Sequence, residues 1–188
     1  MTTLREAVEQ RARVEGGLLM VDGFLNHRVE LDIVQTAARE LLDRYEATPI
    51  DLILTAEASG IPPALACAAE LDVPVVYAKK YLGVGDRYAI SREVTSPTRG
   101  TEYRVEVSRR AISPAERVLI VDDFLSGGRT AEALGEIATE AGAEIVGFGF
   151  LIEKSYAEGR ERLEVRDWRV ESVVSITSLS PTGFEVAS

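Results

Sequence analysis

The sequence predicts an α/β fold in which a central parallel sheet is flanked by helices. From Ile50 onward, short apolar runs that are typical of buried strands alternate with segments of helical periodicity. Polar residues directly follow several of these runs. The carboxyl ends of parallel strands share one edge of a sheet, and ligands bind at that edge. The 188 residues are enough for one hydrophobic core, so we expect a single domain over residues 1–188.

The N-terminal elements are predicted from capping and glycine signals. A capping box from Thr3 to Glu6 begins a helix, which we expect to end at Gly16 and Gly17. Apolar residues at helical spacing predict a second helix before Pro49. The expected order is a helix over residues 3–14, a strand over 17–22, a loop over 23–27 and a helix over 31–45.

The central part of the chain repeats a strand, a turn and a helix. A buried strand over residues 50–55 leads into a turn at 57–60 and a helix over 62–71 that carries proline in its first turn. The other expected elements are strands over 73–78, 118–121, 144–152 and 169–176 and a helix over 130–141. Helical connections of this kind imply that the strands run parallel.

Residues 82–110 differ from the rest. Two polar segments with alternating hydrophobicity, 87–95 and 101–109, are separated by Pro97 and Gly100. This pattern predicts a hairpin that projects from the sheet and is too polar to be buried on both faces.

Composition excludes several classes of protein. A net charge of −10 argues against nucleic acid as a partner, and no apolar run approaches the roughly 20 residues that span a membrane. The single cysteine, Cys67, excludes an internal disulfide and suits a reducing compartment. The amphipathic N-terminal segment does not resemble a secretion signal. We therefore expect a cytoplasmic protein.

Residues 118–130 carry the clearest functional signal. A buried strand runs into Asp122 and Asp123, and the small residues 126–128 then lead into the helix over 130–141. Glycines let a backbone approach an anion closely, and the first amides of a helix point toward it with the positive end of the helix dipole. Paired carboxylates suit vicinal ribose hydroxyls, although they could also cap the loop or bind a metal. The stretch predicts a cradle for a phosphorylated sugar.

This stretch resembles the phosphoribosyl pyrophosphate (PRPP) motif of the type I phosphoribosyltransferases. The resemblance spans roughly residues 4–178. Within the family, the chain is similar to the bacterial xanthine-specific branch, because several motifs match it in the same order along the chain. The matching segments are residues 21–27, 57–61, 73–80, 118–128 and 152–155. Arg129 stands where the general motif has its second glycine, and the xanthine branch also has a long polar residue there. The match is weakest over 82–110.

The resemblance implies a fold and an activity. The fold would be a type I phosphoribosyltransferase sheet with an N-terminal hood from residues 1–30 and a flexible hairpin lid from 82–110. The enzyme would transfer ribose 5-phosphate from PRPP to xanthine in purine salvage, giving xanthosine 5′-monophosphate and pyrophosphate. Guanine or hypoxanthine is the alternative base. The family also implies a homodimer.

Two other functions compete with this one. A regulator of the same fold could sense PRPP without catalysis, but such regulators carry an N-terminal DNA-binding domain. Only about 15 residues precede the first predicted strand, and the chain is acidic, so we expect the enzyme. A nucleotide hydrolase is disfavoured because the sequence contains no G-x-x-x-x-G-K-[ST] loop.

The resemblance assigns the PRPP-binding residues by position. Asp122 and Asp123 would hold the ribose hydroxyls as the catalytic pair, and one of them would stabilise positive charge on the sugar. The 5-phosphate would contact Ser126, Gly127, Gly128, Arg129 and Thr130. The pyrophosphate would contact Glu57, Ala58, Ser59, Gly60, Lys79 and Lys80, although such turns and lysine pairs also occur as ordinary surface. Mg²⁺ would be bound mainly through PRPP and pyrophosphate, with no dedicated protein ligands.

The purine would be recognised by Leu19, Asn26 and Lys154. Lys154 offers only hydrogen-bond donors, which suit the carbonyl of a 6-oxopurine and not the amino group of adenine. The Asn26 amide would donate to a second carbonyl, which xanthine has at position 2, although Asn26 could equally be a turn residue. Phe124 would stack on the base or pack in the core.

Overall fold

An eight-stranded mixed sheet forms the centre of the molecule in a computed structural model that describes residues 2–81, 88–95 and 102–187. Its strands, in spatial order, are β10 (Gly183–Val186), β9 (Val170–Ser180), β8 (Glu144–Lys154), β7 (Arg117–Leu125), β3 (Leu52–Ala56), β4 (Val75–Tyr81), β6 (Glu102–Ser108) and β5 (Ala89–Thr95). The strands from β9 to β4 in this order are parallel, whereas β10, β6 and β5 pair antiparallel at the edges. The predicted central parallel sheet is confirmed.

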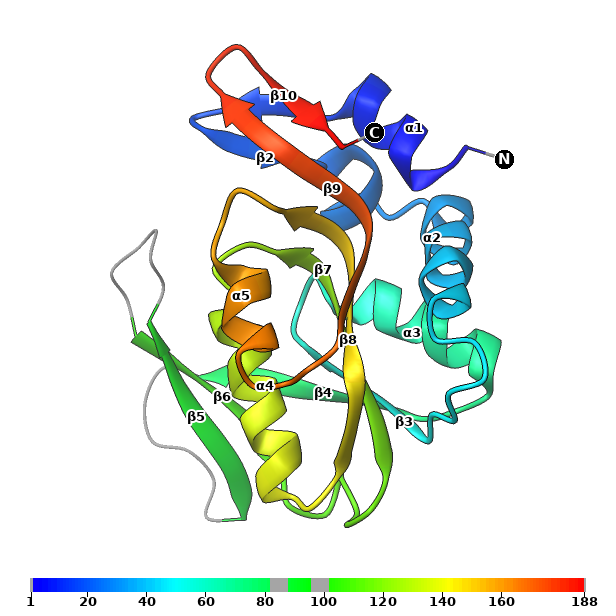
Figure 1. Ribbon diagram of the computed structural model, residues 1–188, viewed down its shortest axis with the longest axis vertical. Helices are drawn as coiled ribbons and strands as arrows, with labels where there is room; N and C mark the ends of the chain where they lie inside the picture. The colour runs from blue at the N-terminus through cyan, green and yellow to red at the C-terminus, as the bar shows by residue number, and fades with distance from the viewer. Residues whose placement is uncertain (1, 82–87, 96–101, 188) are drawn as a thin grey trace.

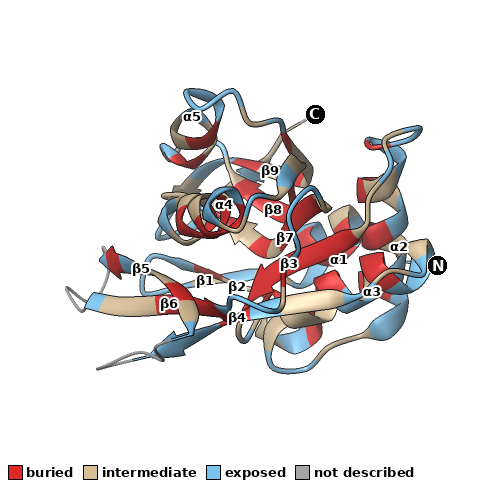
Figure 2. Cartoon of the chain, turned by 90° about the horizontal axis from the view of Figure 1, so that it is seen from below, coloured by how far each residue is buried: buried red, intermediate tan, exposed pale blue. Residues whose placement is uncertain are grey.

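Helices cover both faces of this sheet (Figure 1). The helices α2 (Leu31–Asp43) and α3 (Ile61–Leu71) lie on one face, and α4 (Arg129–Glu140) and α5 (Gly159–Glu164) on the other. Alternate residues of β7 serve the two layers. Leu119 and Val121 pack in the cluster that includes α2 and α3, and Val118 and Ile120 pack in the cluster that includes α4. This two-sided burial explains the unbroken apolar run of β7, and Figure 2 shows the inner side of α4 buried.

The N-terminal segment differs from the sequence prediction. Helix α1 (Leu4–Arg11) has the predicted capping box, but it ends before the glycines. Gly16 and Gly17, with φ of 57° and 78°, form the turn of a hairpin between β1 (Arg13–Glu15) and β2 (Leu18–Met20). The predicted helix end was wrong because two glycines with positive φ also make the tightest hairpin loop, whereas β2 lies within the strand predicted over 17–22. A short π-type helix, η1 (Asp22–Asn26), replaces the predicted loop.

The N-terminal layer, which comprises α1, β1, β2 and η1, covers the carboxyl ends of β8 and β9 (Figure 1). Its apolar residues form one cluster with the ends of those strands; the fully buried members include Leu4, Val8, Phe24, Leu25, Leu151, Ile152, Val174 and Ile176. This packing places the layer at the edge of the sheet where ligands bind in parallel α/β folds.

The strands also run further than their apolar residues suggest. The strand β4 includes Lys79 and Lys80, β7 includes Asp122 and Asp123, and β8 ends at Lys154. The ladder continues here because backbone pairing does not require apolar side chains. The segment after β8 contains α5, and β9 and β10 form a terminal hairpin that the sequence prediction lacked.

The predicted hairpin is confirmed as β5 and β6, and it extends the sheet because β6 also pairs with β4. One face is buried in the cluster that contains α4, through Ile90, Val94, Val105 and Val107. Residues 82–87 and 96–101 of the predicted lid lie outside the described residues. Among the helices of the described chain, none combines the length and apolar character that crossing a bilayer requires.

Candidate active site

A cavity of about 300 Å³ lies at the carboxyl ends of β7 and β8. This site cavity is lined by the whole 126–130 loop, by Asp122 and Phe124 of β7, and by Lys154 of β8. Hairpin residues Val94, Thr95 and Tyr103 complete the wall. The structure therefore brings the predicted sugar-phosphate residues and one predicted purine residue into a single space.

The 126–130 loop has the backbone form of an anion cradle. Gly128 has φ of 72° and caps α4, which begins at Arg129. The amides of Arg129, Thr130 and Ala131 stand in the first helical turn, where no intrahelical acceptor exists, and the positive end of the helix dipole lies there. A negatively charged group fits this position better than a neutral one.

Asp122 and Asp123 face opposite sides of β7. Asp122 lines the site cavity, whereas Asp123 is 5% exposed and its Oδ1 accepts a 3.0 Å hydrogen bond from the Ser59 hydroxyl. The Asp123 backbone N–H donates to Asp122 Oδ1 at 2.9 Å. Burial first, and then the neighbouring Asp123, raises the pKa of Asp122 well above its ordinary value. The two carboxyls therefore occupy different environments and suit different contacts.

The 57–60 turn lies directly beside this carboxyl pair. A Cβ on Gly60 would lie 2.5 Å from Asp122 Oδ1 and 2.2 Å from Thr55 Oγ1, so glycine allows the close approach. The peptide bond between Glu57 and Ala58 is cis. The Glu57 carboxylate accepts a 2.7 Å hydrogen bond from the backbone N–H of Lys80, which ties the turn to β4. Glu57 thus anchors the turn.

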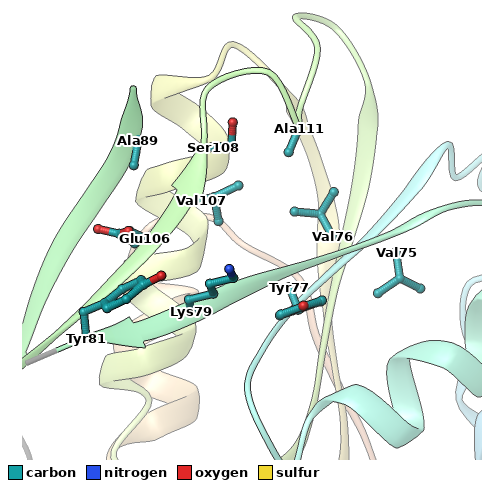
Figure 3. Close-up of a pocket in the computed structure, with 10 residues that line it drawn as sticks. All are labelled: Val75, Val76, Tyr77, Lys79, Tyr81, Ala89, Glu106, Val107, Ser108 and Ala111. Atoms are coloured by element: carbon teal, nitrogen blue, oxygen red, sulfur yellow. The ribbon is translucent and has the colours of Figure 1, made fainter. Parts of the chain in front are cut away.

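The two adjacent lysines lie on opposite faces of β4. Lys80 Nζ lies 5.7 Å from the centroid of the Tyr103 ring, and its charge acts on Asp122. Lys79 lines a separate cavity of about 350 Å³ with Tyr77, Tyr81 and Glu106 (Figure 3). Strand alternation accounts for this separation. The structure brings Lys80 to the site cavity's side of the sheet and places Lys79 on the other side.

Lys154 and Phe124 form the end of the site cavity nearest the N-terminal layer. Lys154 Nζ lies 5.6 Å from the centroid of the Phe124 ring, and burial lowers the pKa of Lys154. Phe124 also packs against the N-terminal cluster. An aromatic face and a donor-only cation at one wall suit a flat heterocycle with carbonyl oxygens.

The other two predicted purine residues belong to the N-terminal layer. Leu19 is 7% exposed and packs in the N-terminal cluster. Asn26 Oδ1 is buried and has no hydrogen-bond partner in the described structure. Neither side chain lines the site cavity.

Several residues at the site were not predicted from the sequence. The Tyr103 hydroxyl lies 2.7 Å from Thr130 Oγ1, which joins the hairpin to the 126–130 loop. Arg162 of α5 donates to the Gly127 carbonyl at 2.8 Å, and Gly159 packs against the same loop. These contacts join residues far apart in the chain, so no local pattern could reveal them.

Arginines of the hairpin have protein partners. Arg92 pairs with Glu136 and Glu140 of α4, and Arg104 pairs with Glu93. Arg129 donates to the Thr95 carbonyl at 3.1 Å. Arg87 and Arg99 are outside the described residues.

The comparison with known families agrees with the geometry. A family described as the phosphoribosyl transferase domain matches residues 20–188. A xanthine phosphoribosyltransferase of Alkaliphilus metalliredigens is 40% identical over 182 residues, which cover 96% of this chain and 90% of that protein. One from Chloroflexus aurantiacus is 43% identical over 170 residues, covering 90% and 81% respectively.

Solved structures share the same architecture. An adenine phosphoribosyltransferase from Thermoanaerobacter pseudethanolicus has a TM-score of 0.75 at 22% identity, covering 92% of this chain and 99% of that one. One from Rhodothermus marinus has a TM-score of 0.74 at 26% identity, covering 92% and 98%. The resemblance inferred from the sequence motifs is thereby confirmed over most of the chain. The sheet has the type I phosphoribosyltransferase fold, and the chain belongs to the phosphoribosyltransferase family.

Proposed function

We propose that this protein is a purine salvage enzyme that transfers ribose 5-phosphate from PRPP to xanthine, giving xanthosine 5′-monophosphate and pyrophosphate. The observation that carries the proposal is the shared site cavity of the 126–130 loop, Asp122 and Lys154. These three features would bind the three parts of a nucleotide: the loop the phosphate, Asp122 the ribose, and Lys154 the base. The names of the relatives described above support xanthine as the base.

The sugar-phosphate half of the site follows from the cradle. The 5-phosphate accepts hydrogen bonds from the amides at Gly128, Arg129 and Thr130 and from the hydroxyls of Ser126 and Thr130. Asp122 binds the ribose hydroxyls from the cavity floor. Asp123 acts from the opposite face of β7, through Ser59 and its backbone, and holds the 57–60 turn in place.

The pyrophosphate half is formed by the 57–60 turn and Lys80. The backbone of Ala58, Ser59 and Gly60 presents amides beside Asp122, and Glu57 fixes the turn to β4. Lys80 supplies a cation on the same side of the sheet. Lys79 lies on the other face of β4 and does not line the site cavity. Its predicted contact with pyrophosphate would therefore have to be made in the site of a second copy of the chain.

Magnesium fits this site as an ion carried by the substrate. No three His, Cys, Asp or Glu side chains within the described ranges gather to hold a metal, and Asp122 is the acidic side chain that lines the site cavity. Because Mg²⁺ bound to polyphosphates takes few protein ligands, oxygens of PRPP and water would supply most of its ligands, with Asp122 nearby. Bound Mg²⁺ would neutralise negative charge on the departing pyrophosphate.

Catalysis follows from orientation and electrostatics. Bond cleavage at the ribose carbon leaves positive charge on the sugar ring, which the carboxylate of Asp122 would stabilise while the cradle and the 57–60 turn hold the two ends of PRPP. The raised pKa of Asp122 reflects its burial in the absence of that charge. A neighbouring cationic sugar would favour its ionised form.

Base choice depends on two polar groups. Lys154 would donate to the carbonyl at position 6, which adenine lacks. The side-chain amide of Asn26, whose Oδ1 is buried without a partner in the described structure, would donate from its NH2 group to the second carbonyl of the ring, with Leu19 supporting that layer as a hood. Guanine carries an amino group there and hypoxanthine only hydrogen, so neither accepts this bond; they are the alternative substrates.

The cellular setting and assembly belong to the same proposal. We place the enzyme in the cytoplasm as a single domain and a homodimer, with the β5–β6 hairpin acting as a lid. The buried Cys67 and the acidic net charge of −10 support a reducing compartment and a small-molecule substrate rather than nucleic acid.

The proposal is tested by incubating the purified protein with PRPP, Mg²⁺ and each of xanthine, guanine, hypoxanthine and adenine. The expected product is the xanthine nucleotide, formed with one pyrophosphate for each base consumed. A preference for guanine or hypoxanthine would change the substrate and keep the enzyme class. PRPP binding without nucleotide from any base would instead favour a PRPP-sensing regulator.

A further inference from the structure

Helix α5 supports the phosphate cradle from the side away from the site cavity. Arg162 Nε donates a 2.8 Å hydrogen bond to the carbonyl oxygen of Gly127, yet Arg162 does not line the site cavity. We propose that Arg162 is a positioning residue for PRPP, which fixes the peptide that presents the cradle's first amide. This inference rests on the proposed function, because it assigns the loop to the 5-phosphate.

The geometry of a peptide bond explains how this contact acts. In a planar trans peptide the C=O and the following N–H point in opposite directions. The carbonyl of Gly127 is held by Arg162 behind the loop, so the N–H of Gly128 is directed to the other side of the loop, where the site cavity lies. Glycine on both sides of this peptide leaves its orientation free unless a partner holds it.

Arg162 is itself held by the helix that supplies the other amides. Its Nη1 lies 3.2 Å from Glu132 Oε2, in the first turn of α4. The Glu132 backbone N–H donates to the Gly128 carbonyl at 2.8 Å. One guanidinium therefore links the loop and the beginning of α4, the two parts of the cradle, in a fixed relation.

Close backbone packing limits movement of the loop toward α5. A Cβ on Gly159 would lie 2.1 Å from the Ser126 carbonyl oxygen, and one on Gly128 would lie 2.9 Å from Gly159 Cα. The loop and the first residue of α5 thus touch without intervening side chains. This packing restrains the position of the loop, and the hydrogen bond from Arg162 restrains the orientation of the Gly127 carbonyl.

Arg166 provides a matched control. It pairs with the same Glu132 at 2.7 Å and with Glu136 at 2.8 Å, and neither bond reaches the loop. Arg166 follows the end of α5, and replacing it with alanine removes similar ion pairs with α4 without freeing the Gly127 carbonyl. A general loss of packing or charge around α4 would affect both variants.

The test compares Arg162→Ala, Arg162→Lys and Arg166→Ala with the wild type. The measurements are KM for PRPP, KM for xanthine, kcat, and the affinity for ribose 5-phosphate alone. We expect Arg162→Ala to raise the KM for PRPP and weaken ribose 5-phosphate binding about tenfold, or about 1.4 kcal/mol, with the KM for xanthine within about twofold. Arg162→Lys keeps a cationic donor and should recover part of this loss. Arg166→Ala should change the KM for PRPP less than about twofold.

Three results would overturn this inference and leave the proposed function intact. They are an unchanged KM for PRPP in Arg162→Ala, an equal rise in the KM for PRPP in Arg166→Ala, or equal rises in the KM for PRPP and for xanthine in Arg162→Ala. An Arg162→Lys variant as impaired as Arg162→Ala would also count against it. Thermal melting of each variant identifies any loss of folding, and ribose 5-phosphate binding by the folded fraction remains decisive. A wild-type protein that binds neither PRPP nor ribose 5-phosphate would instead overturn the proposed function.

Discussion

The Ser59 hydroxyl donates a 3.0 Å hydrogen bond to Asp123 Oδ1 and so joins the turn after β3 to the acidic end of β7. Asp123 is 5% exposed, while its neighbour Asp122 lines the site cavity. The two adjacent carboxyls therefore have separate tasks in our account. Asp122 contacts the sugar, and Asp123 holds together the two segments that bind the ends of PRPP.

This bond predicts an effect of Ser59→Ala on PRPP. Loss of the hydroxyl leaves a buried carboxylate oxygen without its partner, which costs about 1–3 kcal/mol. We expect a KM for PRPP about fivefold to 100-fold higher and a KM for xanthine that changes far less. Ser59→Thr retains the hydroxyl and serves as the control. Equal kinetics for Ser59→Ala and the wild type would show that the bond does not organise the site.

The two lysines of β4 predict a difference between neighbouring substitutions. Lys80→Ala removes a cation on the side of Asp122, whereas Lys79→Ala removes one on the opposite face. We expect Lys80→Ala to raise the KM for PRPP about tenfold and Lys79→Ala to raise it less in an isolated protomer. Steady-state kinetics at a protein concentration where the oligomeric state is known would check this. A larger effect of Lys79→Ala would place its side chain at a site completed by a second copy.

Lys154 predicts a loss confined to the base. Its Nζ lies 5.6 Å from the centroid of the Phe124 ring, and no hydrogen bond between its side chain and the 126–130 loop is found among the described residues. Removing a charged donor to the base carbonyl should raise the KM for xanthine about 10-fold to 100-fold in Lys154→Ala. The KM for PRPP should stay within about threefold. Similar losses for both substrates would contradict the placement of Lys154 at the base.

Gly60 predicts a steric effect on the same carboxyl. A methyl group there would meet Thr55 Oγ1 at 2.2 Å and Asp122 Oδ1 at 2.5 Å. Gly60→Ala should therefore cost about 1–3 kcal/mol of stability and displace Asp122, lowering kcat with PRPP. Gly183→Ala is the control, because nothing lies within 4 Å of its Cβ position. Denaturant unfolding and kcat would be measured together, and a fully active, equally stable Gly60→Ala protein would refute the contact.

The pKa of Asp122 predicts a gain of stability on its removal. Burial raises this pKa in the folded protein, so the folded state loses stability as pH rises from about 3.9, the unfolded value, through the raised folded value. Asp122→Asn removes this cost and keeps an oxygen to accept the Asp123 N–H. The variant should melt at a higher temperature than the wild type near pH 7, and the difference should shrink toward about pH 4.

Asp51 supplies the opposite case as a control. Hydrogen bonds from Arg117 lower the pKa of Asp51 to about 2. Its contribution is present above the unfolded pKa and is lost as pH falls from that value through the folded pKa of about 2, so Asp51→Asn should melt lower near neutral pH. If Asp122→Asn also melted lower than the wild type near pH 7, the ionised Asp122 carboxylate would not destabilise the folded state, which would contradict the prediction.

What the sequence could predict depended on whether the signal was local. The strand ending in Asp122 and Asp123, with its following loop, was predicted because the whole motif is contiguous. Gly16 and Gly17 were misread because one local pattern suits both a helix end and a hairpin turn. The separation of Lys79 from Lys80 required the strand to continue past its apolar residues.

Contacts between distant segments were beyond local patterns altogether. Ser59 and Asp123 are 64 residues apart, and Gly127 and Arg162 are 35 apart. Nothing in the residues around Arg162 distinguishes it from Arg160, the other arginine of α5, since each has a carboxylate partner four residues away. Only the folded arrangement shows that one of them holds a loop carbonyl.

The central claim is that the carboxyls of β7 and the adjoining cradle form the catalytic centre for PRPP and xanthine. The most direct test measures xanthosine 5′-monophosphate and pyrophosphate formed by the wild type and by the double variant Asp122→Asn, Asp123→Asn, with circular dichroism to confirm folding. We predict equal amounts of both products from the wild type and a loss of turnover of at least about 100-fold in the folded double variant. Wild-type turnover in that variant would contradict the account.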